Sequence, residues 1–267
     1  MVCKAERAAA GALEAPAGEV AAHVRSAAAP GVDQTGGRQG GRRAWLWVAV
    51  AGGATAFRID RSRGAKALRS LVGEAMGPTL VSDRFPAYAR APDRQLCWAH
   101  LRRDFQAMVD RDAGGQVVGA ALLQPSGRVF DRWRPLGRGE IGRRTLRGCV
   151  SVLRPLVRSL LAAGSACGCA RTAAVCGKLL PTERHLWRFA SAEGVPPHNN
   201  AAERALRHAV IWRKTSHGTD SEAGSRYVER VLSVVATCRQ RGRDVLGYLE
   251  GCLRSRLDGS PVPSLLT

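Results

Sequence analysis

Two apolar runs on either side of a Gly-Gly pair constrain the fold of this chain more than any other feature of its sequence. AWLWVAV (44–50) and TAFRID (55–60) flank AGGA, which is the pattern of a β-hairpin. A further strand is expected around Asp33, ahead of a Gly- and Arg-rich turn at GGRQGGRR (36–43). The sequence therefore predicts three consecutive strands.

The segment after the third strand alternates helices with short strands. A helix is expected at 62–76, where apolar residues recur at helical spacing. Strands are expected at LVSD (80–83) and RQLCWAH (94–100), with a short helix between them, and LRRDFQAMVDR continues as a helix. This order of elements predicts an α/β fold.

The expected organisation has four parts. They are an N-terminal segment that is partly helical or frayed (1–30, with a helix in 18–30 that Pro30 stops), the first part of a core (31–112), a helical insertion (113–192), and the completion of the core (193–267). The insertion is expected to break at 113–115, 125–127 and 135–140. The last part is expected to carry the helix HNNAAERALRHAVIWRK and helices at 221–240 and 244–257.

Three carboxylates are far apart in the sequence, so only a tertiary fold can bring them together. Asp33 lies in GVDQTG, Asp83 ends LVSD, and Glu203 lies near the start of a helix. Because open α/β sheets hold ligands at the carboxyl ends of their strands, Asp83 is a candidate site residue. Each acid also has a structural interpretation: Asp33 as a turn former, Asp83 as a helix cap, and Glu203 as the partner of Asn200 in a capping box.

The surroundings of Glu203 favour a functional site. Asn199 and Asn200 are the only asparagines in the chain; a cap needs only one amide, and two can also orient a carboxylate or a phosphate. His100, in CWAH, is a further candidate near the site, with a buried structural histidine as the alternative. The basic residues that follow Glu203 are candidates for contacts with DNA phosphates, or are solvated surface charges: Arg204, Arg207, Arg213 and Lys214.

The net charge of the chain indicates a polyanionic partner. Lysine and arginine number 41 against 22 aspartate and glutamate, which gives a formal charge of +19 at pH 7. The excess is spread along the chain instead of being confined to one tail. DNA or RNA is the commonest partner of such a field.

The eight cysteines show no disulfide framework, and neither a signal peptide nor an apolar run of membrane-spanning length is apparent. A soluble cytoplasmic protein with reduced thiols and no membrane partner is therefore expected. Four cysteines invite a zinc interpretation, but C-x-C-x6-C lacks a paired C-x2-C knuckle. Buried thiols are favoured over zinc at Cys97, Cys167, Cys169 and Cys176.

Four segments in register resemble the insertion-sequence 66 (IS66) family of bacterial DDE transposases, over roughly residues 15–267. They are DQTGGR with RRAWLWVAV, then SDRFPAY, then LCWAHLRRDFQAM, then HNNAAERALRHAVIWRKTSHGTDSEAGSRYVERVLSVVATCRQRGRDVLGYL. The resemblance implies a ribonuclease-H-like fold: a mixed sheet flanked by helices, with a helical insertion between the second Asp and the Glu and a helical C-terminus. It also implies that Asp33, Asp83 and Glu203 form the catalytic, metal-binding triad.

The activity implied by the resemblance is DNA strand cleavage and strand transfer in transposition of an insertion sequence. Two Mg²⁺ or Mn²⁺ ions are expected as cofactors, because carboxylates suit these metals. DNA is the expected partner, both as transposon ends and as target. On the strength of the family alone, a homo-oligomer and accessory proteins of the element are expected as well.

The chain also departs from the family's pattern. The first motif usually reads DETGW, whereas Gln34 and Gly37 replace its acid and its tryptophan, and His198 stands where a Thr or Asp usually precedes the two asparagines. Members usually carry an upstream helical and zinc-binding region, so an N-terminally truncated copy is expected. The alternative function is a catalytically inactive DNA-binding remnant. A ribonuclease-H-like nuclease acting on RNA is a third possibility.

Overall fold

The computed structural model describes residues 2–74, 76, 79–111 and 114–267, and the chain divides into two compact units. The first unit contains the chain up to Leu80, Arg84–Pro92 and Asn199–Thr267. The second contains Val81–Asp83 and Asp93–His198. Each unit is described by itself.

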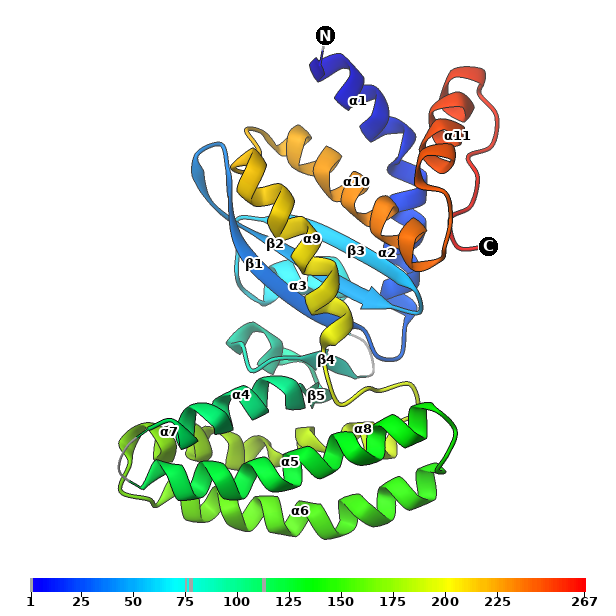
Figure 1. The fold of residues 1–267 in the computed structure, drawn as a ribbon. Helices are drawn as coiled ribbons and strands as arrows, with labels where there is room; N and C mark the ends of the chain where they lie inside the picture. Colours follow the sequence, from blue (N-terminus) through cyan, green and yellow to red (C-terminus); the bar gives the residue numbers. More distant parts are fainter. Residues whose placement is uncertain (1, 75, 77–78, 112–113) are drawn as a thin grey trace. The chain divides into compact units, whose positions relative to one another are not determined.

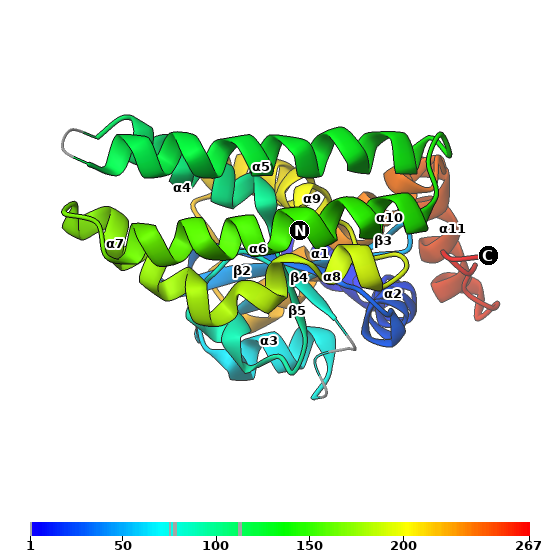
Figure 2. The ribbon, with the colours of Figure 1, turned by 90° about the horizontal axis from the view of Figure 1, so that it is seen from below.

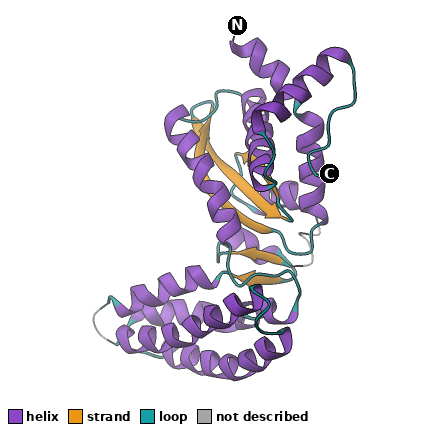
Figure 3. Cartoon of the chain, turned by 45° about the vertical axis from the view of Figure 1, so that its right-hand side comes forward, coloured by secondary structure: helices purple, strands orange, loops and turns teal. Residues whose placement is uncertain are grey.

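A mixed sheet of five strands has the order β3-β2-β1-β4-β5. Its long strands are β1 (Gly31–Gln39), β2 (Arg42–Ala51) and β3 (Ala54–Asp60), which form an antiparallel meander in the first unit (Figures 1 and 3). The short strands are β4 (Leu80–Ser82), of which Leu80 belongs to the first unit and the rest to the second, and β5 (Arg94–Leu96). The three predicted strands before residue 61 are confirmed.

Two Gly-Gly pairs make the turns of the meander. Gly52 and Gly53 both have positive φ, as a two-residue hairpin turn requires, so the predicted hairpin is confirmed. Gly40 and Gly41 form the other turn in the same way. The predicted turn at 36–43 was too long, because β1 continues through Gly36 and Gly37 as far as Gln39, which pairs with Arg42.

Helices account for the rest of the first unit. The helix predicted at 18–30 begins and ends earlier than expected. The helix predicted at 62–76 is shorter than expected, and Ala75, one of the residues expected on its apolar face, lies outside the described residues. The helices at the end of the chain are confirmed to within a few residues. The helices are α1 (Val2–Ala12), α2 (Glu14–Ser26), α3 (Ala65–Val72), the short 3-10 helix η1 (Pro86–Arg90), α9 (Asn200–Ser216), α10 (Glu222–Gln240) and α11 (Val245–Asp258).

Both faces of the β1–β3 meander are buried. Alternate residues of β2 point to opposite faces. Trp47 and Ala49 pack with α2 and α3 on one face, whereas Leu46 and Val48 pack with α9 on the other. Trp45 lies on the same face as Trp47, and Trp47 is fully buried. The position of α9 over this sheet is visible in Figure 1.

Side chains of α10 close the free edge of the meander. The backbone N–H of Thr55 donates to Thr237 Oγ1 (3.1 Å), that of Phe57 to Ser233 Oγ (2.9 Å), and that of Ile59 to Glu229 Oε1. Four residues along a helix rise about 6 Å and two along a strand about 6.8 Å, so the two series stay in step. An edge strand that would otherwise expose its hydrogen-bonding groups is thereby covered.

The second unit is mainly helical (Figure 2). Helix α4 packs against α5, α5 against α6, and α6 against α7. Gly119 allows the first of these contacts, since a Cβ there would lie 2.6 Å from the Phe105 carbonyl oxygen. The helices are α4 (Trp98–Val109), α5 (Gly115–Gly137), α6 (Arg143–Ser165), α7 (Ala170–Leu179), the 3-10 helix η2 (Leu180–Leu186) and α8 (Arg188–Ser191).

Two predictions for this unit were wrong. The strand predicted at 94–100 ends at Leu96, and α4 begins at Trp98, so His100 lies on a helix. The break predicted at 125–127 is absent, because α5 runs through Pro125 and ends at Gly137. Burial of Pro125 and packing of α5 on two neighbouring helices outweigh the local cost of a helical proline, about 3 kcal/mol. Of the break predicted at 113–115, Ala113 lies outside the described residues.

Within the described part of the chain, no helix has both the length and the apolar character that crossing a bilayer requires.

The buried carboxyl at the sheet edge predicts a pH-dependent stability. Burial raises the pKa of Glu229 from 4.5 to about 7, against the opposing effects of Arg226 and of the Ile59 N–H. The folded state therefore retains a proton that the unfolded chain releases. Stability is greatest below pH 4.5 as far as this group is concerned, and is lost as pH rises through about 7.

We expect Glu229→Gln, which keeps an oxygen to accept from Ile59, to remove this dependence. The wild type should lose about 3 kcal/mol more than the variant between about pH 4 and pH 8, measured by urea unfolding. The control is Glu222→Gln, an exposed acid in the first turn of the same helix. If the free energies of unfolding of the wild type and of Glu229→Gln changed with pH in parallel, the raised pKa of Glu229 would be contradicted.

Candidate active site

Asp33 lies on the face of the sheet that α9 covers. It is the third residue of β1, it is half-buried, and its register partner on β2 is Val48. Residues directly opposite each other in an antiparallel pair share a face, and Val48 packs with Ala202 and Leu206 of α9. Asp33 Oδ1 accepts a hydrogen bond of 2.8 Å from the Gln34 N–H. The interpretation of Asp33 as a turn former is therefore wrong.

Glu203 lies in the first turn of the helix that covers this face. Its neighbour Ala202 is fully buried against the sheet, which fixes the start of α9 on the meander. The Glu203 N–H donates to the Asn199 carbonyl oxygen (3.1 Å), so Asn199 is the N-cap residue and Asn200 is already helical. The capping box with Asn200 as cap is therefore wrong by one residue, and α9 has no side-chain cap hydrogen bond.

Asn199 ties this helix start to the strand of Asp33. Its side chain is 2% exposed, and Nδ2 donates to the Val32 carbonyl oxygen at 2.6 Å. Gly31 makes room for it, since a Cβ there would lie 2.8 Å from Asn199 Oδ1. Sequence reasoning did not single out Gly31, because only the tertiary contact shows why a side chain is excluded. The contact holds Asp33 and Glu203 on two elements that are bonded to each other.

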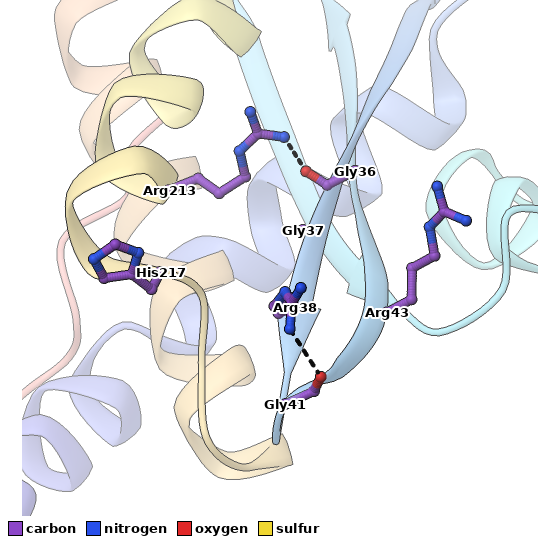
Figure 4. A pocket seen from close by; sticks show the side chains of 7 residues that line it. All are labelled: Gly36, Gly37, Arg38, Gly41, Arg43, Arg213 and His217. Atoms are coloured by element: carbon purple, nitrogen blue, oxygen red, sulfur yellow. Dashed lines mark hydrogen bonds between the residues drawn. The ribbon is translucent and has the colours of Figure 1, made fainter.

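The far end of α9 is bound to the same strand. Arg213 Nη1 donates to Thr35 Oγ1 (3.0 Å) and to the Gly36 carbonyl oxygen, the second contact being drawn in Figure 4. Arg213 is half-buried. The other basic residues predicted to contact DNA are exposed on this helix: Arg204, Arg207 and Lys214.

The two departures from the usual first motif, Gln34 and Gly37, do not alter the packing of the sheet face on which Asp33 lies. Gln34 alternates with Asp33 and has Trp47 as its register partner, so its side chain lies on the opposite face, where Oε1 accepts from Arg63 Nε at 3.3 Å. Gly37 lies on the same face as Asp33, and a Cβ there would meet Arg213 Cδ at an ordinary 3.7 Å. Neither residue disturbs the strand that carries the acid.

Asp83 and His100 belong to the second unit. Asp83 directly follows β4, as the sequence predicted, and the Asp83 carbonyl oxygen accepts from Ser82 Oγ at 2.9 Å. Phe85, and not Asp83, is the N-cap residue of η1, so the capping interpretation of Asp83 is wrong. His100 lies in the first turn of α4, where its N–H donates to the Cys97 carbonyl oxygen at 3.1 Å. Its role near the acids stays a prediction.

The cysteines considered for zinc carry free thiols. Cys176 is buried on α7, where burial raises the pKa of its thiol to about 11. Cys167 Sγ donates to the Cys169 carbonyl oxygen at 3.7 Å.

Comparison with known proteins identifies the relatives of this chain. Residues 1–227 match the model of the family described as "Transposase IS66 family", a range that includes all three candidate acids. The chain is similar to the "Uncharacterized protein y4qI" of Sinorhizobium fredii (strain NBRC 101917 / NGR234), with 29% identity over 252 residues, which cover 84% of this chain and 46% of that protein. The chain thus spans less than half the length of this relative. No solved structure matches.

The paired asparagines allow a matched test of the helix anchor. Asn199→Asp replaces the donor to the Val32 carbonyl by a buried acceptor and should lower the free energy of unfolding by about 1–3 kcal/mol. Asn200→Asp places a negative charge in the first turn of α9 and should be neutral or slightly stabilising. Urea unfolding of both variants measures the difference; equal effects would show that Asn199 does not anchor the helix.

Proposed function

Because this chain belongs to the IS66 family of transposases, we propose that it is a DDE transposase catalytic domain that cleaves and transfers DNA strands with divalent metal ions. Asp33, Asp83 and Glu203 are its catalytic acids. The observation that carries the proposal is the placement of Asp33 and Glu203 on two elements that Asn199 bonds together. Asp83 directly follows β4, and a five-stranded mixed sheet with flanking helices is consistent with a ribonuclease-H-like core.

The donor chemistry of these residues fits Mg²⁺ or Mn²⁺. All three are carboxylates, which hard divalent cations prefer, and Asp33 lies half-buried on the α9 face. Asp33, Asp83 and Glu203 would hold two ions, and such ions activate the attacking water or 3′-hydroxyl and stabilise the leaving oxygen. Asn199 positions Glu203 by fixing the start of α9 on β1. The basic surface of the chain, with a formal charge of +19, attracts the DNA.

The roles of the remaining candidates follow from this proposal. Arg204, Arg207 and Lys214 are exposed on the helix of Glu203 and contact DNA phosphates beside the acids. Arg213 has a structural contact with β1 in addition. Asn200 and His100 are positioning residues of the same site. A homo-oligomer, accessory proteins of the element, and the transposon ends and target as substrates belong to the whole transposase.

Carboxylate-to-amide substitutions test the proposal. Asp33→Asn, Asp83→Asn and Glu203→Gln should each reduce Mg²⁺- or Mn²⁺-dependent nicking of a supercoiled plasmid at least about 100-fold, which corresponds to about 2.7 kcal/mol of transition-state stabilisation. Calorimetry should show weaker metal binding for all three, while DNA binding in EDTA persists. The matched control is Glu222→Gln, since Glu222 is the acid in the first turn of α10 as Glu203 is in that of α9.

Two outcomes would count against this function. If the three variants nicked DNA at the rate of the wild type, the three acids would not be catalytic residues. A folded wild type that binds DNA but neither takes up metal nor nicks DNA would support the inactive DNA-binding remnant instead. Activity on RNA–DNA hybrids alone would favour a ribonuclease.

A further inference from the structure

A basic groove of about 870 Å³ lies where the turn between β1 and β2 meets the end of α9 (Figure 4). Its cationic side chains come from three elements and from both faces of the hairpin: Arg213 lies on the α9 face, whereas Arg38 on β1 and Arg43 on β2 alternate to the face of Trp45, so the groove extends around the edge of the hairpin. His217, the C-cap residue of α9, is the remaining side chain that lines it. Arg38 and Arg43 were not singled out in the sequence, since their meeting with α9 depends on the fold.

The glycines of the groove leave its floor open without a structural need to do so. A Cβ at Gly36 would meet nothing within 4 Å, and one at Gly37 would make only ordinary contacts. Neither has a positive φ, in contrast to Gly41 of the turn. Glycine weakens a strand interior and commonly marks a place where a ligand approaches the backbone closely. Access of a ligand to the backbone explains the two glycines, which packing does not require.

The charges in the groove are arranged unfavourably for the isolated protein. Arg38 and Arg43 are register partners, so two like charges stand directly opposite each other across the hairpin, a destabilising arrangement. Arg43 lies over the Trp45 ring at 5.5 Å, and Arg38 Nη1 reaches the Gly41 carbonyl oxygen at 3.5 Å. In the described part of the chain, no ion pair joins Arg38, Arg43 or Arg213 to a carboxylate. An anion in the groove would relieve this repulsion.

A second groove, in the other unit, differs in the charges that line it. It measures about 690 Å³ and contains Arg128 and Arg132, but also Asp131. Asp131 is paired with Arg134 at 2.6 Å. The groove in the second unit therefore carries its own counter-charge, whereas the lining of the groove at the end of α9 contains no acid.

The groove is held in shape by the chain that leaves α9. The Thr219 N–H donates to the Arg38 carbonyl oxygen (3.1 Å), and the Gly40 N–H donates to the Thr219 carbonyl oxygen (2.7 Å). Gly218 permits this approach, because a Cβ there would lie 2.4 Å from the Arg38 carbonyl oxygen. Together with the bond from Arg213 to Thr35, these contacts fix the backbone of Arg38 and the side chain of Arg213 before any ligand binds.

The groove lies at a similar distance from two of the candidate acids, from Asp33 along β1 and from Glu203 along α9. Three to five residues of β1 separate Asp33 from Gly36 and Arg38, which is about 10–17 Å at the rise of a strand. Ten residues of α9 separate Glu203 from Arg213, which is about 15 Å at the rise of a helix. DNA advances about 3.4 Å per nucleotide, so this length corresponds to about three to five base pairs.

We propose that Arg38, Arg43 and Arg213, over the open backbone of Gly36 and Gly37, bind the phosphate backbone of duplex DNA about three to five base pairs from the phosphate at the acids. This proposal rests on the function proposed above, because DNA is its substrate there. The groove positions the duplex and carries no sequence information, as contacts to phosphates alone do.

Binding to a fluorescent 30-base-pair duplex, measured by anisotropy in EDTA over a series of salt concentrations, tests the groove without any need for cleavage. The slope of log K against log salt is negative, and each lost phosphate contact reduces its magnitude by about 1. Arg38→Gln/Arg43→Gln should therefore reduce the magnitude of the slope by about 2, with an unchanged or higher melting temperature because the opposed charges are gone. Gly36→Val, which fills the floor, should weaken binding about tenfold.

The control is Arg90→Gln/Arg239→Gln, which removes two exposed arginines from the same unit and should change the slope by less than about 0.5. Equal slopes for the two double variants would overturn the proposal, since the charges would then act only through the general field. Wild-type affinity in Gly36→Val would do the same for the floor. Tighter binding of duplex RNA than DNA, lost in Arg38→Gln/Arg43→Gln, would assign the groove to RNA. These readouts do not depend on nicking activity, because DNA binding is measured in EDTA, so the proposed groove can be tested even if the chain does not cleave DNA.

Discussion

The hydrogen bonds between α10 and the edge of β3 are the interaction on which the first unit depends. Three side chains of one helix, Thr237, Ser233 and Glu229, accept the three backbone N–H groups that β3 would otherwise expose. Because β3 pairs with β2 and β2 with β1, this closure supports the whole meander up to the strand of Asp33. One of the three acceptors is a buried carboxyl, which ties the stability of the sheet to its protonation.

Helix α9 is fastened to β1 at both of its ends. Asn199 bonds Val32 at the start, and Arg213 bonds Thr35 at the other end. The first contact places Glu203 over the face of Asp33, and the second places Arg213 in the basic groove. These two contacts hold Asp33, Glu203 and Arg213 on one strand and one helix of the first unit.

Local signals were reliable where short-range physics decides the structure. The AGGA turn, the apolar strands around it and the helices after residue 220 were predicted, because turn glycines and periodicity act within a few residues. Local signals failed where packing outweighs them. Pro125 continues a helix that α4 and α6 support, Gly36 and Gly37 form a strand paired with β2, and His100 lies on a helix that begins directly after a shortened strand.

The strand meander, the basic charge, the family and the identity of the candidate acids could all be read from the sequence, because each is encoded in motifs or composition. The tertiary fold was needed to show that Asp33 faces α9, that Asn199 bonds the start of α9 to β1, and that Gly31 must lack a side chain. The meeting of Arg38 and Arg43 with Arg213 is of the same kind. These facts depend on contacts between residues more than 150 positions apart, and no local pattern encodes such contacts.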